Sequence, residues 1–67
     1  MKPYAKVRAD LGVNQSEFWS RVGVTQSGGS RYETGRKPGK PVQMLLALAY
    51  GTEKERKAVM KQLGIQG

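Results

Sequence analysis

The chain has 67 residues and a mass of 7.4 kDa, which allows one domain with a small core. Twelve Lys and Arg against five Asp and Glu give a formal net charge of +7, which indicates a polyanionic partner or a membrane surface. The absence of Cys and His excludes disulfides and the usual zinc ligands, and so few carboxylates argue against an enzyme, so we expect no cofactor, metal or catalytic residue.

The N-terminal segment is predicted to be a helix that starts at Pro3 and is ended by Gly12. Pro suits a first helical position, and Gly suits the left-handed position that follows a helix. Apolar side chains recur between them at i, i+3 and i+7, which places them on one helical face: Tyr4, Val7 and Leu11.

A second helix is predicted between Asn14 and Gly23. Asn14 is a favourable N-cap, and Glu17 three residues later makes a variant of the capping box. This helix carries three apolar side chains that we expect to face the core: Phe18, Trp19 and Val22.

A third helix is predicted over residues 26–33, with Thr25 as its N-cap. Two adjacent glycines, Gly28 and Gly29, oppose this prediction, because together they cost a helix about 2 kcal/mol relative to alanines. A loop over residues 27–30 is the alternative.

A fourth helix is predicted to begin at Pro41, after the basic, breaker-rich loop of residues 34–40, and to end at Gly51. This helix is apolar nearly all round, which is typical of a helix with no solvated face. We therefore expect it to be the buried centre of the bundle.

A last helix is predicted to open with a capping box formed by Thr52 and Glu55 and to close at Gly64. Its lysines at i, i+3 and i+7 form either a solvated face or a distal phosphate contact: Lys54, Lys57 and Lys61. Its C-terminal end is more apolar than a monomer needs, which suggests a homodimer contact through Met60, Leu63 and Ile65. Five helices with short connections predict a compact all-α domain over residues 1–67.

The second and third helices, joined by a turn at Gly23, form a helix-turn-helix pattern over residues 15–33. At about 100° per residue, one sector of the third helix, about 140° wide, holds only hydrogen-bonding or cationic side chains: Gln26, Ser27, Ser30 and Arg31. The opposite sector holds small or aromatic residues: Gly28, Gly29 and Tyr32. Such a helix suits the major groove of DNA, and an ordinary solvated face is the alternative.

Chemistry indicates a role for each of these side chains. Gln26 follows the helix N-terminus and can pair with N6 and N7 of adenine. Ser27 and Ser30 can bond a base or a phosphate, while Arg31 can read guanine or clamp phosphate. The loop that follows adds three cations, which are either phosphate contacts or part of a solvated loop: Arg36, Lys37 and Lys40.

The segment from Gln15 to Glu33 resembles the Cro/repressor family of helix-turn-helix regulators, also called the xenobiotic-response-element type. The similarity includes the leading glutamine, apolar residues at positions 18, 22 and 24, the turn glycine, and the pair Tyr32-Glu33. It extends to Arg8, to the loop of Gly35 and Pro38, and to the leucine-rich fourth helix. It therefore covers most of the chain.

The resemblance implies a lambda-repressor-like, five-helix DNA-binding domain. In that family the position of Gln26 contacts bases, and the position of Gln15 contacts the DNA backbone or supports the first glutamine. The positions of Arg8 and Glu33 often form an ion pair, so we expect Arg8 to be structural.

Two residues depart from the family pattern, which usually has a small residue at position 19 and a branched apolar residue at position 29. Here these are Trp19 and Gly29. Both positions pack at the contact between the two helices, so the exchange approximately conserves volume. We expect the indole to fill the space that Gly29 leaves.

The sequence therefore predicts a sequence-specific regulator of transcription that binds double-stranded DNA, as a dimer on a palindromic operator. The longest apolar run, Met44 to Tyr50, has seven residues, far below the roughly 20 needed to span a bilayer. No apolar stretch of signal-peptide length follows the N-terminus. We expect a cytoplasmic protein, on the nucleoid when bound to DNA, without membrane contact.

The net positive charge is compatible with two other functions. One is an antitoxin-like or other interaction module of the same fold, whose basic face binds an acidic protein such as a toxin. The other is a small RNA-binding protein, but readers of single-stranded RNA usually present stacking aromatics, and the predicted polar face has none.

Overall fold

The computed structural model describes residues 3–65, which contain helices and no strand, so residues 1–2 and 66–67 of the predicted domain lie outside it. The five helices are α1 (Tyr4–Leu11), α2 (Gln15–Ser20), α3 (Gln26–Glu33), α4 (Lys40–Tyr50) and α5 (Glu53–Leu63). The predicted all-α architecture is confirmed, and the segment with two adjacent glycines is a helix. No helix within residues 3–65 is long and apolar enough to cross a membrane.

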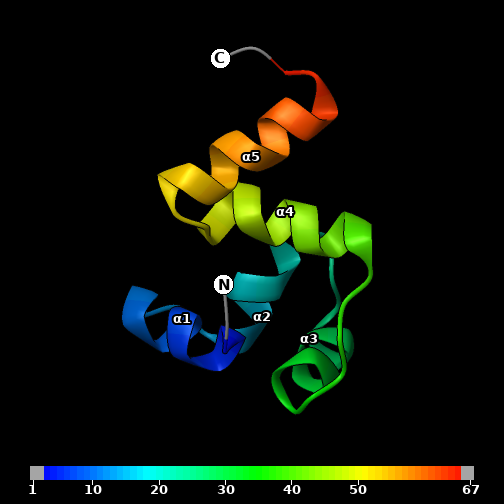
Figure 1. Ribbon diagram of the computed structural model, residues 1–67. Helices are drawn as coiled ribbons and strands as arrows, with labels where there is room; N and C mark the ends of the chain where they lie inside the picture. The colour runs from blue at the N-terminus through cyan, green and yellow to red at the C-terminus, as the bar shows by residue number, and fades with distance from the viewer. Residues whose placement is uncertain (1–2, 66–67) are drawn as a thin grey trace.

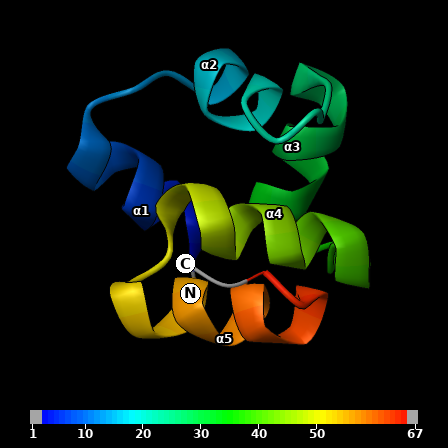
Figure 2. The same ribbon diagram turned by 90° about the horizontal axis from the view of Figure 1, so that it is seen from above.

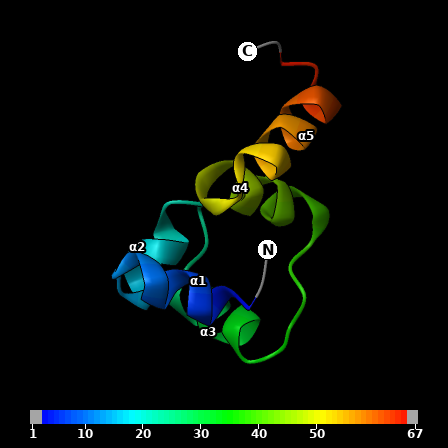
Figure 3. The ribbon, with the colours of Figure 1, turned by 60° about the vertical axis from the view of Figure 1, so that its left-hand side comes forward.

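The helices form two parts (Figure 1). One part consists of α1, α2 and α3, and the other consists of α4 and α5. Seen from above, α4 lies between α5 on one side and the group of α1, α2 and α3 on the other (Figure 2). Figure 3 shows this group at one end of the molecule and α5 at the other, with the loop of residues 34–39 running from α3 to α4. This loop therefore connects the two parts.

Local signals set most helix ends. Gly12 and Gly64 adopt left-handed conformations, with φ of 73° and 79°, after α1 and α5. Three predicted N-cap side chains each accept a hydrogen bond from the first turn of their helix: Asn14, Thr25 and Thr52. The capping box of Thr52 and Glu55 is complete. These particular helix ends therefore lie where their capping residues predict.

Four local details differ from the predictions. α1 begins at Tyr4, with Pro3 as its N-cap, and α4 begins at Lys40. Each start is one residue away from the predicted proline position, because Pro3 and Gly39 supply the first accepting carbonyls, to Val7 and Gln43. The predicted capping box at Asn14 is incomplete. The Glu17 N–H donates to the Asn14 side chain, but the Glu17 carboxylate binds Arg21 at 2.8 Å. The fourth detail is the end of α2.

α2 ends at Ser20, three residues before Gly23, where the sequence places its end. The carbonyl of Trp19 accepts hydrogen bonds from the N–H groups of Val22 and Val24, at 3.1 and 3.0 Å. Such bonds tighten the chain after α2, and Gly23, with φ of 74°, completes the turn. The helix-turn-helix therefore has a shorter first helix and a longer turn than predicted.

The core is centred on α2 and not on α4. Its fully buried side chains are Phe18, Trp19 and Leu46, with Val22 almost buried. α4 lies centrally, but Leu46 is its one buried residue among those described, and Leu45 remains 45% exposed. The prediction that α4 is the buried centre of the bundle is therefore right about its central place and wrong about its burial, because α5 covers one side of it and another side stays open.

An aromatic contact joins the two parts of the molecule. The rings of Phe18 and Tyr50 stack, with centroids 4.0 Å apart and planes 9° from parallel. The Tyr50 hydroxyl also donates a 2.6 Å hydrogen bond to the carbonyl of Phe18. Carbonyls near a helix end need such partners, so Tyr50 both packs against α2 and satisfies its backbone.

The expected fit between Trp19 and Gly29 is confirmed. Gly29 is buried in α3, and a Cβ atom at this position would overlap the Cγ and Cδ1 atoms of the Trp19 indole. The backbone of α3 therefore lies directly against the indole. Only glycine allows this approach, which offsets its cost to the helix.

This contact predicts strong coupling between the two positions. Trp19→Ala should lower the free energy of unfolding by about 3–5 kcal/mol, since it empties a fully buried site. Gly29→Ala should cost about 1–3 kcal/mol in the native chain through overpacking. In a Trp19→Ala background, Gly29→Ala should leave the free energy of unfolding unchanged or raise it by up to about 1 kcal/mol, because alanine is the better helix former.

Urea denaturation of the two single variants and the double variant measures this coupling. If Trp19→Ala is too unstable, Trp19→Leu serves as the background. Additive effects, or a cost of less than about 1 kcal/mol for Trp19→Ala, would contradict the expected fit.

Candidate nucleic-acid interface

The outer face of α3 is polar and largely exposed. Gln26, Ser27 and Arg31 are exposed, and Ser30 is partly buried. On the opposite face Gly29 is buried, while Gly28 and Tyr32 are partly buried. The two sectors predicted from helical spacing are therefore confirmed, and α3 lies at the edge of the molecule (Figure 1).

Both ends of α3 are held by threonine side chains. The Thr25 hydroxyl accepts a hydrogen bond from the N–H of Gly28 at 3.1 Å. The Thr34 hydroxyl donates to the carbonyls of Ser30 and Arg31, at 3.1 and 3.0 Å. Sequence analysis missed Thr34, whose position after a helix is a weak signal. These caps stabilise an eight-residue helix while its outer side chains stay available.

Glu33, the last residue of α3, receives hydrogen bonds from both other helices of its group. Arg8 of α1 donates from Nε to Oε2 at 3.0 Å and from Nη2 to Oε1 at 3.1 Å. From α2, the Trp19 indole N–H donates to Oε2 at 2.7 Å, and the Gln15 amide donates to Oε1 at 3.2 Å. The side chain of Glu33 is only 6% exposed. The ion pair implied by the resemblance is confirmed, with two further donors.

These bonds set both the charge state of Glu33 and the position of Gln15. Burial on its own raises the pKa of Glu33, but the hydrogen bonds from Arg8, Trp19 and Gln15 outweigh it and lower the pKa below its ordinary value. Gln15 is partly buried, and its amide nitrogen binds Glu33. Within residues 3–65 it makes no hydrogen bond to Gln26.

The loop after α3 is anchored at one point. Pro38 is buried, and its carbonyl accepts a 2.8 Å hydrogen bond from the Gln43 amide of α4. The cations of the loop region are exposed around this anchor: Arg36, Lys37 and Lys40. Sequence analysis missed Gln43, because one glutamine after a loop of prolines and glycines is no distinctive signal.

Three of the five acidic residues pair with cations other than these. Asp10, Glu17 and Glu53 pair with cations four residues away in the chain, Lys6, Arg21 and Lys57, at 2.8–3.5 Å. In the described range, no ion pair or hydrogen bond engages the cationic groups next to α3: Arg31, Arg36, Lys37 and Lys40. The positive charge is therefore uncompensated beside the polar face of α3. Long, exposed cations of this kind can contact the phosphates of DNA.

The family model of the RsaL-like HTH domain matches residues 5–49, more than half of the chain. The matched range starts within α1 and reaches almost to the end of α4. No curated protein and no solved structure matches. The family match supports the predicted helix-turn-helix domain, and with it DNA as the partner. It assigns the RsaL-like type, not the Cro/repressor type.

The hydrogen bonds of Glu33 predict how stability depends on pH. A carboxylate whose pKa is lowered by folding adds stability above its unfolded pKa, about 4.3, and loses this contribution as the pH falls through the folded value. Glu33→Gln should therefore cost roughly 3 kcal/mol at pH 7, because Arg8 loses its charged partner. The difference from the native chain should shrink below about pH 4.

Urea denaturation of both proteins between pH 3 and 8 measures this difference. Glu17→Gln is the matched control, since its exposed ion pair should contribute less than about 1 kcal/mol. An equal difference between the native chain and Glu33→Gln at pH 7 and at pH 3 would show that the charge of Glu33 contributes nothing.

Proposed function

Because this chain belongs to the family of RsaL-like HTH domains, we propose that it is a sequence-specific regulator of transcription that binds double-stranded DNA. One observation carries the proposal: the polar face of α3 is exposed beside cations that have no partner among the described residues. In this proposal residues 1–67 act as one domain, with the helix-turn-helix over residues 15–33. The protein acts by occupying DNA and not by catalysis.

Residues 26–33 enter the major groove in the manner of Cro/repressor proteins. Gln26, exposed in the first turn of α3, reads the edge of a base, with adenine as its best partner. Ser27, Ser30 and Arg31 complete the contact surface. The bonds to Glu33 support this role, because they hold α3 at one angle to α1 and α2 while its outer face meets DNA.

Phosphate groups are bound by the cations of the following loop and by Gln15. Arg36, Lys37 and Lys40 follow α3 in the chain and are exposed, as phosphate contacts require. The Gln15 amide donates one hydrogen to Glu33 and has a second that can reach a phosphate at the start of α2. These contacts supply affinity and orientation without reading sequence.

The protein binds as a dimer on a palindromic operator. Leu63 and Ile65, at the end of α5, are 49% and 50% exposed, and Met60 lies partly buried beside them in the chain. Burial of these side chains against a second copy would remove apolar surface from water. Two recognition helices would then reach half-sites about 34–36 Å apart.

DNA binding should depend steeply on salt. With about six phosphate contacts, affinity for a random duplex should fall roughly 1,000-fold between 50 and 200 mM salt, because each contact releases counterions. Fluorescence anisotropy with a labelled duplex measures this. No binding at low salt, or an affinity that salt does not change, would reject DNA as the partner and favour the antitoxin-like alternative.

Two substitutions should separate sequence reading from phosphate binding, on a site selected from random duplexes. Gln26→Ala should cost about 1–3 kcal/mol of binding and relax the preference at one base pair of each half-site. Lys37→Ala should weaken all sequences alike and reduce the salt slope by about one.

Lys6→Ala is the control for both variants, since this exposed lysine pairs with Asp10 on α1 and should leave DNA affinity unchanged. A selected site without two-fold symmetry would argue against the dimer. Equal loss on all sequences for Gln26→Ala would argue against base reading.

A further inference from the structure

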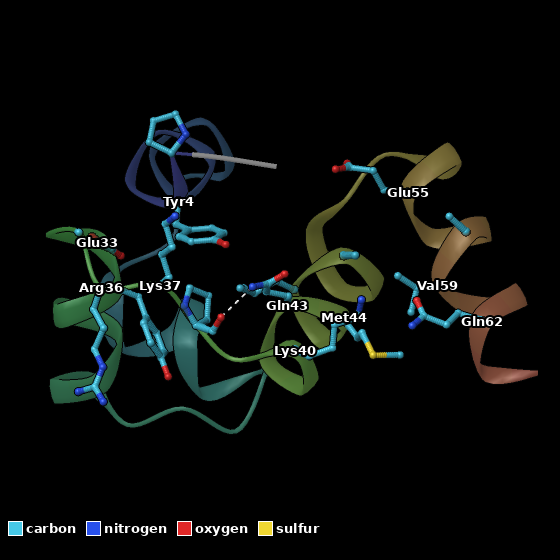
Figure 4. Close-up of a pocket in the computed structure, with 17 residues that line it drawn as sticks. Tyr4, Glu33, Arg36, Lys37, Lys40, Gln43, Met44, Glu55, Val59 and Gln62 are labelled. Carbon is cyan, nitrogen blue, oxygen red and sulfur yellow. Dashed lines mark hydrogen bonds between the residues drawn. The ribbon is translucent and has the colours of Figure 1, made fainter.

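A groove of about 740 Å³ lies between the two parts of the molecule (Figure 4). Tyr4 stands on one side of it, Val59 and Gln62 of α5 stand on the other, and Gln43 and Met44 of α4 lie between them. Small-molecule sites in proteins usually measure roughly 300–1,000 Å³. None of the four residues assigned to the reading face of α3 lines the groove, but the three cations assigned to phosphate do: Arg36, Lys37 and Lys40.

The walls of the groove combine apolar side chains with polar and charged ones. Four apolar residues line the groove from two helices that run side by side (Figure 1): Met44 and Ala47 of α4, and Ala58 and Val59 of α5. Aromatic rings and a buried proline also line the groove: Tyr4, Tyr32 and Pro38. A surface of this kind accepts a hydrocarbon chain, and each buried methylene strengthens binding about fourfold.

The charges along the groove are separated. Lys37 and Lys40 lie where α4 begins, and both are exposed without a partner in the described part of the chain. Glu55 lies at the start of α5, near the opposite end of α4, about 15 Å away along an 11-residue helix. Arg36, in the loop after α3, also lines the groove. The carboxylate of Glu33 lies at the groove but is held by Arg8, Gln15 and Trp19.

We propose that this groove binds an anionic amphiphile of the long-chain carboxylate class and that its binding competes with DNA. The carboxylate binds Lys37 and Lys40, and the hydrocarbon chain lies along the apolar walls. The competition rests on the proposed function, because these two lysines are also assigned to phosphate. Linkage requires that DNA weaken ligand binding by the same factor as the ligand weakens DNA binding.

Titration of the ¹⁵N-labelled full chain with monomeric decanoate tests the site. The amide signals of Ala47, Ala58 and Gln62 should shift and saturate. Dodecanoate should bind about 16-fold more tightly, since it buries two more methylenes. Decyltrimethylammonium, with the same chain and opposite charge, should bind at least about tenfold more weakly, because Lys37 and Lys40 repel it.

Matched variants locate the binding. Ala58→Leu fills the groove from α5 and should weaken decanoate binding at least about tenfold, whereas Ala49→Leu, at an exposed position of α4 outside the groove, should not. Lys40→Ala should weaken it similarly, with Lys6→Ala as its control. Absence of saturable shifts, or equal binding of the cationic amphiphile, overturns the site.

The competition is tested by measuring DNA affinity with and without decanoate. Saturating decanoate should weaken DNA binding at least about tenfold in the native chain, and this effect should disappear in Ala58→Leu. DNA affinity that decanoate does not change overturns the competition. A protein that binds no DNA in the absence of decanoate overturns the proposed function instead, while the titration alone still decides the site.

Discussion

The carboxylate of Glu33 determines how three of the five helices meet. A buried charge is costly unless hydrogen bonds replace its hydration, and this one receives four, from Arg8, Gln15 and Trp19. The donors come from α1 and α2, and the acceptor ends α3. A shift of any of the three helices would leave a buried charge or donor unpaired, so one relative arrangement is strongly preferred.

Trp19 links this polar cluster to the apolar core. Its indole N–H reaches Glu33, its ring packs edge-on against Phe18 and Tyr4, and its face receives the backbone of α3 at Gly29. One large side chain thus serves both packing and hydrogen bonding, which suits a chain too short for an extensive core. The outer face of α3 takes no part in these contacts and is left for a partner.

The loop of residues 34–39 connects α3 to α4. It leaves α3, is anchored by the bond from Gln43 to Pro38, and enters α4 beside the groove. Lys37, in this loop, and Lys40, the first residue of α4, both line the groove. In the two proposals, an anionic ligand in the groove and a DNA phosphate would bind the same two lysines.

The sequence alone determined the features that depend on neighbours in the chain. Caps such as Thr25, the helical spacing that exposes Gln26 on α3, and the positive charge after α3 are local, so they could be predicted. The Trp19–Gly29 fit was also predictable, since the two changes in size compensate. The tertiary structure decided which donors reach Glu33, how Gln43 anchors the loop, and how much of α4 remains exposed. These depend on the distances between helices, which neither periodicity nor capping encodes.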